Sequence, residues 1–198
     1  MHLPARPQRI ARALLRQIPP LIAAVGIASA SAAAPAPEDV HAPLQMEAGT
    51  WDAEVTFFTA DAPSGHARGV QTNRLLANGH RIVNEFRIPA GDGRPPYEGI
   101  GVWGYDTVAK AYVGTWNDTN DLSVRIDHGY WHAAEKTMVW SSKVNDGAGH
   151  FVDYRITEEF RGDERVFTFY QLGIVKPDPH PLVKIVFTRR TEADTGSS

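Results

Sequence analysis

The chain has 198 residues, of which 42% are hydrophobic, as expected for a single folded domain. It has no cysteine, which excludes a disulfide framework, a thiolate nucleophile and a cysteine-ligated metal site. Without the four arginines of the first 16 residues, 16 Lys and Arg face 23 Asp and Glu, a formal charge of −7. This acidic balance argues against nucleic acid and anionic membrane surfaces as partners.

Residues 1–32 have the pattern of a cleavable secretory signal peptide. Four arginines and no acid precede an apolar, alanine-rich stretch, and Ala28-Ser29-Ala30 fits a small-x-small cleavage site. The alternative is a membrane anchor. However, Leu21 to Ala34 is shorter than the roughly 20 apolar residues of a spanning helix, and Pro19-Pro20 interrupts it. We therefore expect a periplasmic or secreted protein with no membrane insertion after cleavage.

The mature chain is expected to consist of one domain with a flexible segment at each end. Residues 33–43 are rich in alanine and proline and are predicted to be a linker without a packed role. Residues 191–198 are predicted to be a disordered tail. Residues 44–190 show no convincing helical periodicity, and their short alternating runs are separated by turn residues. This pattern predicts an all-β domain of about ten antiparallel strands.

The first hairpin is predicted at Asn78-Gly79, a sequence typical of a type I′ turn. The pairing places Leu75 opposite Ile82 and Asn73 opposite Asn84. The second strand has two candidate polar sets for a cavity, one on each face; the alternative for either is a solvated face with cross-strand charge pairs. One face carries Arg81, Glu85 and Arg87, and the other carries His80 and Asn84.

The second hairpin joins residues 97–106 to residues 111–118 and concentrates aromatic side chains on one face. Pairing Asp106 with Ala111 places each tryptophan opposite a glycine. Four aromatic residues then share a face, which Asp118 continues: Trp103, Tyr105, Tyr112 and Trp116. We interpret this face as lining a pocket for a flat or hydrophobic ligand; the alternative is that the rings fill the barrel.

Asp118 itself has two interpretations. It can anchor a ligand hydroxyl or amine at the mouth, or act as a base if it is desolvated. The alternative is a turn residue, since residues 117–121 are rich in side chains that bond to their own backbone.

The remaining strands are expected at residues 123–130, 136–144, 150–160, 165–174 and 182–190. In the third of these, one face carries Val152, Tyr154, Ile156 and Phe160.

The two ends of the domain carry residues that are typical of barrel closure. Gly49 and Trp51 open the first strand, and Arg189 lies on the last. An indole that plugs one end and a guanidinium stacked on it satisfy the cation and the ring face together. This combination resembles the closure of calycin-type β-barrels.

Several segments together resemble a bacterial family of unknown function, domain of unknown function 1579 (DUF1579). They are residues 44–51, Asn78-Gly79-His80-Arg81, Gly101–Asp106 with Tyr112–Asp118, and Phe187-Thr188-Arg189. The resemblance implies a single calycin- or lipocalin-like barrel, often exported, with no settled activity and no catalytic residues to carry over. Lipocalins, fatty-acid-binding proteins and haem-binding nitrobindins are similar in architecture, which does not transfer function.

The histidines supply candidates for other chemistry. His150 is placed as a ligand-contacting or haem-axial residue, and His180 as a second possible haem ligand; the alternative for His150 is a rim residue. His128 and His132 are about 13 Å apart on a strand, so no metal site is predicted.

The sequence therefore predicts an exported barrel that binds a small hydrophobic or aromatic molecule. The ligand-binding candidates are Trp103, Tyr105, Tyr112, Trp116, Asp118 and His150. No cofactor is expected, and the oligomeric state stays open. The alternatives are an enzyme with isomerase- or lyase-type acid–base chemistry using Asp118, a histidine or Glu85, a haem binder, and a protein-interaction module.

Overall fold

The structure of the chain is a computed structural model that describes residues 39–59, 62–145, 149–172 and 180–191. The expected signal peptide and most of the expected linker and tail lie outside these ranges. The described chain contains a short 3₁₀ turn, η1 (Asp39–His41), a helix, α1 (Ala42–Glu47), and ten strands. The strands are β1 (Gly49–Thr59), β2 (Ala62–Leu75), β3 (Ile82–Ile88), β4 (Tyr97–Asp106), β5 (Ala111–Asp118), β6 (Asp121–His132), β7 (Thr137–Asn145), β8 (Phe151–Arg161), β9 (Glu164–Gln171) and β10 (His180–Arg189).

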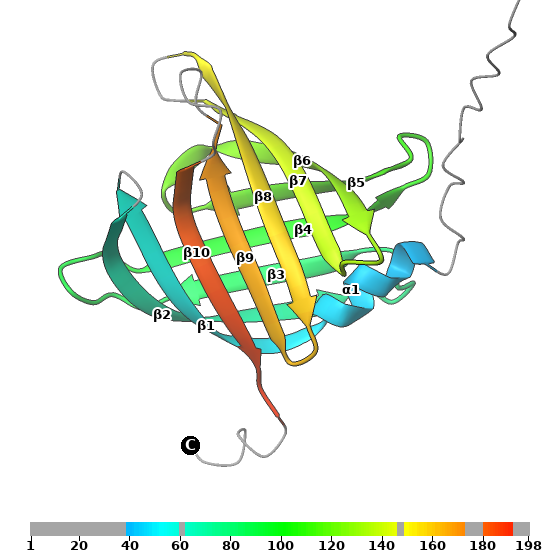
Figure 1. Ribbon diagram of the computed structural model, residues 1–198, viewed down its shortest axis with the longest axis horizontal. Coiled ribbons are helices and arrows are strands. Elements are labelled where there is room, and N and C mark those ends of the chain that lie inside the picture. The colour runs from blue at the N-terminus through cyan, green and yellow to red at the C-terminus, as the bar shows by residue number, and fades with distance from the viewer. Residues whose placement is uncertain (1–38, 60–61, 146–148, 173–179, 192–198) are drawn as a thin grey trace, which may run out of the picture. The chain divides into compact units, whose positions relative to one another are not determined.

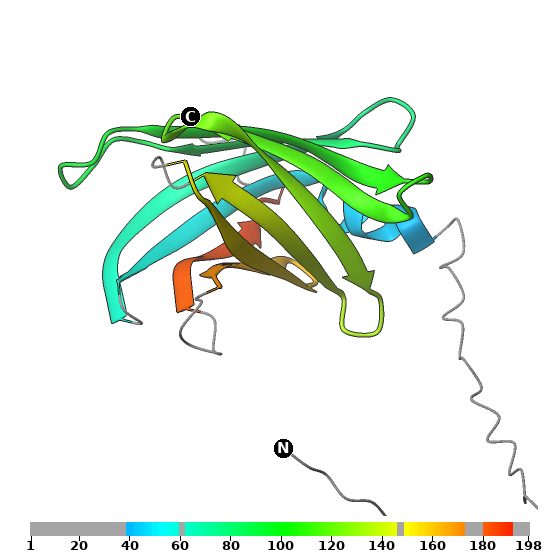
Figure 2. The ribbon, with the colours of Figure 1, turned by 90° about the horizontal axis from the view of Figure 1, so that it is seen from above.

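The ten strands form one closed antiparallel barrel (Figures 1 and 2). Each strand pairs with its neighbours in the chain, and β1 also pairs with β10, so that Trp51 lies opposite Arg189. Closure leaves no unpaired edge, which is how small up-and-down barrels avoid edge-to-edge association. The predicted all-β, ten-strand antiparallel barrel is confirmed.

Both predicted hairpins have the expected register. Leu75 pairs with Ile82 and Asn73 with Asn84. In the second hairpin the register places Trp103 opposite Gly114. The first turn is wider than a two-residue type I′ loop, because the Gly79 amide donates to the Leu76 carbonyl and strand pairing resumes at Leu75 and Ile82. The strand register is the same as for the shorter loop, because it depends on the position of the centre of the turn.

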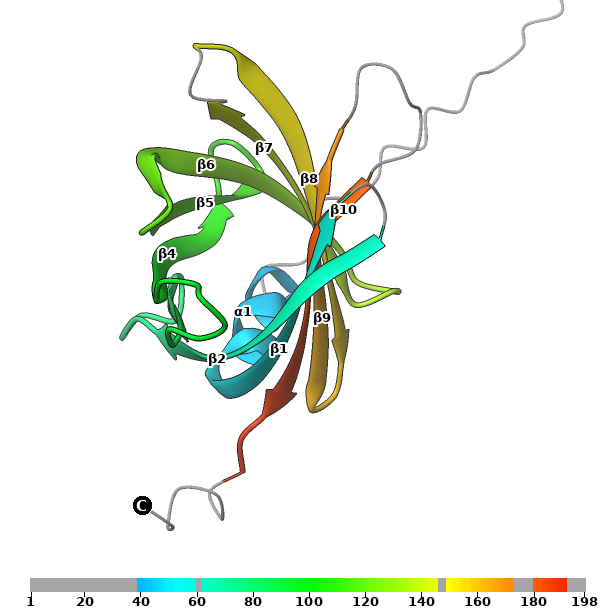
Figure 3. The same cartoon turned by 90° about the vertical axis from the view of Figure 1, so that its left-hand side faces the viewer.

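The segment from Asp39 to Glu47 is packed, which corrects the prediction of a linker up to residue 43 and of no helix. Leu44 is fully buried, and the Tyr112 hydroxyl donates to the Val40 carbonyl at 3.0 Å. Pro43 lies in the first turn of α1, where a proline costs no helical hydrogen bond. Figure 3 shows α1 framed by the ring of strands, so that it closes one end of the barrel.

The closure residues lie as predicted. The Arg189 guanidinium carbon is 4.1 Å from the centroid of the Trp51 ring, and Trp51 is completely buried. Arg189 also donates to the Met46 and Ala48 carbonyls at 2.6 and 2.5 Å, which ties β10 to the end of α1. Gly49 has φ of +124°, and a Cβ there would lie 2.7 Å from the Arg189 Nη1. Only glycine meets both conditions.

Two apolar clusters fill part of the barrel interior. One cluster, around Leu44, Ile82 and Met138, packs beneath α1, and the other, around Trp51 and Phe187, follows β1 and β10. The space that remains between them is a cavity.

Candidate functional site

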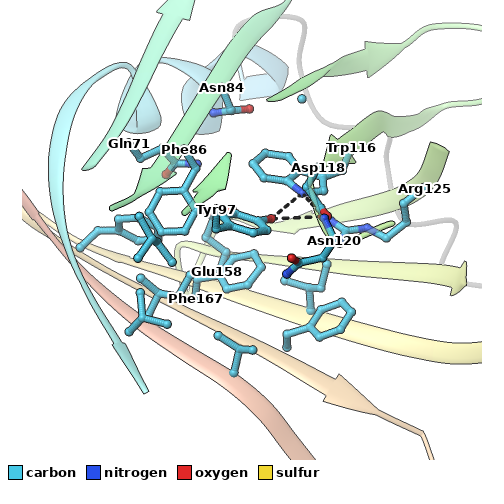
Figure 4. A pocket seen from close by; sticks show the side chains of 18 of the residues that line it. Gln71, Asn84, Phe86, Tyr97, Trp116, Asp118, Asn120, Arg125, Glu158 and Phe167 are labelled. Carbon is cyan, nitrogen blue, oxygen red and sulfur yellow. Dashed lines mark hydrogen bonds between the residues drawn. The ribbon is translucent and has the colours of Figure 1, made fainter. Parts of the chain in front are cut away.

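The barrel encloses a cavity of about 520 Å³, within the range of pockets that hold small molecules. Its middle is lined by apolar side chains that point inward from several strands, among them Val55, Phe86, Trp103, Trp140, Phe167 and Ile185. Figure 4 shows Phe86 and Phe167 converging on this space, with polar residues toward its two ends. The end beneath α1 is called the floor here, and the end at the β3–β4 and β5–β6 loops is called the mouth.

Three side chains form a hydrogen-bonded triangle at the mouth. The Tyr97 hydroxyl and the Trp116 indole nitrogen donate to Asp118 Oδ2 at 3.2 and 3.0 Å, and the same indole lies 3.1 Å from the Tyr97 oxygen (Figure 4). Asp118 Oδ1 accepts from the backbone amides of Asn120 and Asp121. One oxygen of Asp118 thus stabilises the turn between β5 and β6, and the other accepts hydrogen bonds from the cavity residues Tyr97 and Trp116.

A charged pair lies beside this triangle. Arg125 donates to both carboxylate oxygens of Asp127 at 2.9 to 3.1 Å. Its guanidinium carbon lies 5.4 Å from the Phe169 ring centroid and 6.0 Å from that of Trp116. This part of the cavity wall is therefore polar, but the charges of Arg125 and Asp127 balance each other.

The floor is a buried polar cluster built from five elements. Arg165 of β9 is 1% exposed; its Nη1 donates to Glu47 at the end of α1, at 2.8 Å, and to Glu158 of β8. Its Nη2 donates to Gln71 of β2. Asn84 of β3 donates to the same Glu47 oxygen at 2.8 Å. Two carboxyl groups therefore share one guanidinium in a buried site at the floor of the cavity.

This environment changes the protonation of Glu47. Burial raises the pKa of Glu47 to about 8, the neighbouring Glu158 carboxylate adds to the rise, and Arg165, Trp103 and Asn84 oppose it. The raised pKa favours the protonated form of Glu47 at neutral pH. At the mouth, burial raises the pKa of the Tyr97 phenol, and Asp118 adds to that rise, so Tyr97 stays a hydrogen-bond donor.

The residues predicted to bind a ligand are only partly brought together. Trp103, Trp116 and Asp118 line the cavity. Tyr112 and Tyr105 share the inward face, but their rings pack edge to face near α1, outside the lining. His150 is exposed and lies outside the lining as well.

The polar candidates of β3 lie on opposite faces of the barrel wall. Asn84 is buried in the floor, whereas Glu85 and Arg87 point outward and pair with each other at 3.6 Å, as the solvated-face alternative expects. His80, His128 and His132 are exposed. The side chain of His180 lies outside the described part of the structure.

Glu47, Arg165 and Glu158 were not selected from the sequence. The sequence signal for these residues is their position in the alternating strand pattern. Glu158 lies between Ile156 and Phe160 on the inward face of β8, and Arg165 lies on the same face of β9 as Phe167 and Phe169. A charged residue in phase with an apolar face indicates a buried polar site. The pattern does not reveal which partners it meets.

Two kinds of feature are absent from the described residues. These residues contain no group of three or more histidine or acidic side chains placed to hold a metal ion. Within the same ranges, no helix has the length and hydropathy needed to cross a lipid bilayer.

The fold and the site define a small antiparallel β-barrel with an internal, mainly apolar cavity that has polar groups at both ends. The chain belongs to the family described as "Protein of unknown function (DUF1579)", whose model matches residues 36–189. This confirms the resemblance noted in the sequence. No curated protein matches the chain significantly.

Among solved structures, the chain is similar to Rv2717c from M. tuberculosis. The TM-score is 0.59 with 10% sequence identity, and the match covers 79% of this chain and 99% of that one. At this identity the likeness supports the fold alone.

Proposed function

We propose that this protein is an exported barrel that binds a small hydrophobic or aromatic molecule in its cavity. The observation that carries the proposal is the cavity of about 520 Å³, whose middle is lined by inward-facing aromatic and aliphatic side chains. Export rests on the signal-peptide pattern of residues 1–32. A solidly packed interior, the alternative for a small barrel, would leave no such space.

The lining favours a flat apolar ligand. Trp103, Trp116 and Trp140 present indole surfaces from β4, β5 and β7, and Phe167 lines the same cavity from β9. Gly101 and Gly114 keep two of these indoles close to the strand backbone, since a Cβ would lie 2.6 Å from the Trp116 ring and 2.9 Å from Trp103. Aromatic side chains that line a cavity can stack on the faces of a planar molecule.

The test is native mass spectrometry and an absorbance spectrum on protein purified from the periplasm of its native host without refolding. We expect a discrete additional mass that is lost on denaturation. A clean unliganded mass, together with no heat of binding for apolar aromatic probes, would contradict the proposal. A Soret band would contradict it in favour of haem, although no histidine belongs to the cavity lining among the described residues.

An enzyme on the same barrel is a second candidate, and one observation favours it. A cavity carboxyl with a raised pKa, as in Glu47, is a frequent feature of acid–base catalysts. The discriminating measurements are the mass and the NMR spectrum of the bound molecule after incubation with purified protein. A binding protein returns it unchanged, whereas an isomerase or lyase changes its structure or its mass.

A protein-interaction module would be favoured by an exposed patch formed by the aromatic residues of the second hairpin. The hairpin aromatics Trp103 and Tyr112 are buried inside the barrel and do not form an exposed patch.

A further inference from the structure

The floor of the cavity contains a carboxyl oxygen without a partner. Glu47 lines the cavity, and its side chain is 3% exposed. Its Oε1 accepts two hydrogen bonds, from Asn84 Nδ2 and from Arg165 Nη1, both at 2.8 Å. Its Oε2 is buried and has no hydrogen-bond partner among the described residues. Buried polar atoms are rarely left unpaired, so this oxygen points to a ligand group that the barrel alone does not supply.

The charge balance of the floor determines which form this oxygen takes. Glu47 and Glu158 share the single guanidinium of Arg165. Two carboxylates and one guanidinium have a net charge of −1, so the binding of one proton makes the cluster neutral. Burial raises the pKa of Glu47 to about 8, which places this proton on Glu47 at neutral pH. Because Oε1 is already occupied by two donors, the proton belongs on Oε2. A protonated carboxyl oxygen there is a hydrogen-bond donor.

The groups that face Glu47 carry no surplus positive charge for an anionic ligand, although Arg165 Nε is buried without a hydrogen-bond partner among the described residues. Arg165 of β9 is held by both carboxyl groups and by Gln71 of β2. Asn84 of β3 and Trp103 of β4 are neutral, and Glu158 of β8 is the nearest other acid. An incoming carboxylate would therefore place a second anion beside Glu158 in a buried site.

We propose that the cavity selects neutral molecules with a flat apolar body and one terminal hydrogen-bond acceptor, such as a ketone, aldehyde or ester, which accepts a hydrogen bond from Glu47 Oε2. Carboxylates of the same shape are excluded, and plain hydrocarbons bind more weakly because they leave the donor unpaired. This inference rests on the proposed function and specifies the ligand class of the same cavity.

The test compares three probes that share one aromatic body. They are 2-acetylnaphthalene, which carries a neutral acceptor, 2-isopropenylnaphthalene, which has the same shape without an acceptor, and 2-naphthoate, which is an anion. Binding of each is measured by isothermal titration calorimetry at pH 6.5. We expect the ketone to bind at least about tenfold more tightly than the hydrocarbon, and the carboxylate to bind most weakly.

The same titration at pH 9.5 tests the donor. Deprotonation of Glu47 removes the donor, so the ketone is expected to lose its advantage over the hydrocarbon. In Glu47→Gln the amide donates at both pH values, so the ketone keeps its advantage and the pH dependence disappears. Glu85→Gln is the matched control, because that side chain is exposed and points away from the cavity; it should behave as wild type.

The outcomes separate the two proposals. Binding of none of the three probes overturns the proposed function together with this inference. Binding of the hydrocarbon and the ketone with equal affinity overturns only the inference, as does tightest binding of the carboxylate. A ketone preference that persists unchanged in the wild type at pH 9.5 also overturns it, and this measurement does not depend on whether a variant folds.

Discussion

At the scale of single residues, Glu47 connects barrel closure to the cavity. Its backbone carbonyl accepts from the Trp51 indole at 2.8 Å and from Asn73 at 3.1 Å, while its carboxyl group belongs to the floor. Trp51 lies between two guanidinium groups, those of Arg189 at 4.1 Å and Arg165 at 5.1 Å. The closure residues and the polar floor are therefore one packed unit, and changes in one are expected to reach the other.

The protonation of Glu47 makes stability depend on pH. Its pKa rises from 4.5 to about 8 on folding, so between these values the folded state binds more protons than the unfolded state. The stabilising effect of the bound proton is complete below pH 4.5 and is lost as the pH rises to about 8. The Glu47→Gln side chain does not ionise, so this substitution removes the pH-dependent loss of stability. We expect urea unfolding between pH 5 and pH 9 to show a flatter stability profile in Glu47→Gln than in wild type.

Glu85→Gln serves as the control for that experiment, because it removes an exposed carboxylate of the same type. Its profile should run parallel to that of the wild type. Identical pH profiles for wild type and Glu47→Gln would mean that Glu47 ionises in the folded protein as it does in the unfolded chain.

At the scale of elements, the inward face of β4 is shaped by glycines that seat the Trp116 indole. A Cβ at Gly99 would lie 2.3 Å from Trp116 Cζ2, and one at Gly101 would lie 2.6 Å from Cε3. The indole therefore lies flat across β4, and this position brings its nitrogen to Asp118. The mouth triangle depends on the absence of side chains beneath the ring.

Gly99→Ala is expected to displace the Trp116 indole and to break its bond to Asp118. We expect destabilisation of about 1 to 3 kcal/mol, as for other overpacked sites, with a changed near-ultraviolet circular dichroism spectrum. Gly65→Ala is the matched control on β2, where a Cβ would make only ordinary contacts at 3.7 and 3.8 Å. Equal effects of the two substitutions would argue against the seating of Trp116 as the reason for glycine at position 99.

The elements that could be predicted from the sequence are those with a local signal. The hairpin registers follow from turn position and from the pairing of tryptophans with glycines, which lie within 20 residues of each other. The helix α1 was missed because six residues are too few for periodicity, and its stability comes from the burial of Leu44. The floor was missed because Arg165 and Gln71 are 94 residues apart and meet only when the barrel closes.

At the scale of the whole molecule, barrel closure creates the cavity, because inward side chains from all ten strands face a common interior. Ala67 of β2 is one of the small residues that keep this interior open. Ala67→Phe adds a ring to the cavity without placing a charge or a polar atom there. We expect it to weaken the binding of 2-acetylnaphthalene at least about tenfold, since the ligand loses space and contacts, while the far-ultraviolet circular dichroism spectrum stays that of the wild type.

Arg68→Phe is the paired control, because it adds the same ring one residue along the strand, on the outer face of the barrel. The Arg68 side chain is 87% exposed, and its pair with Glu54 at 3.5 Å contributes little. Arg68→Phe should therefore bind the probe as the wild type does. If Ala67→Phe and Arg68→Phe both bind at wild-type affinity, the probe occupies a surface outside the barrel. If only Ala67→Phe loses binding, the ligand lies in the interior that closure creates, between the polar groups of the floor and those of the mouth.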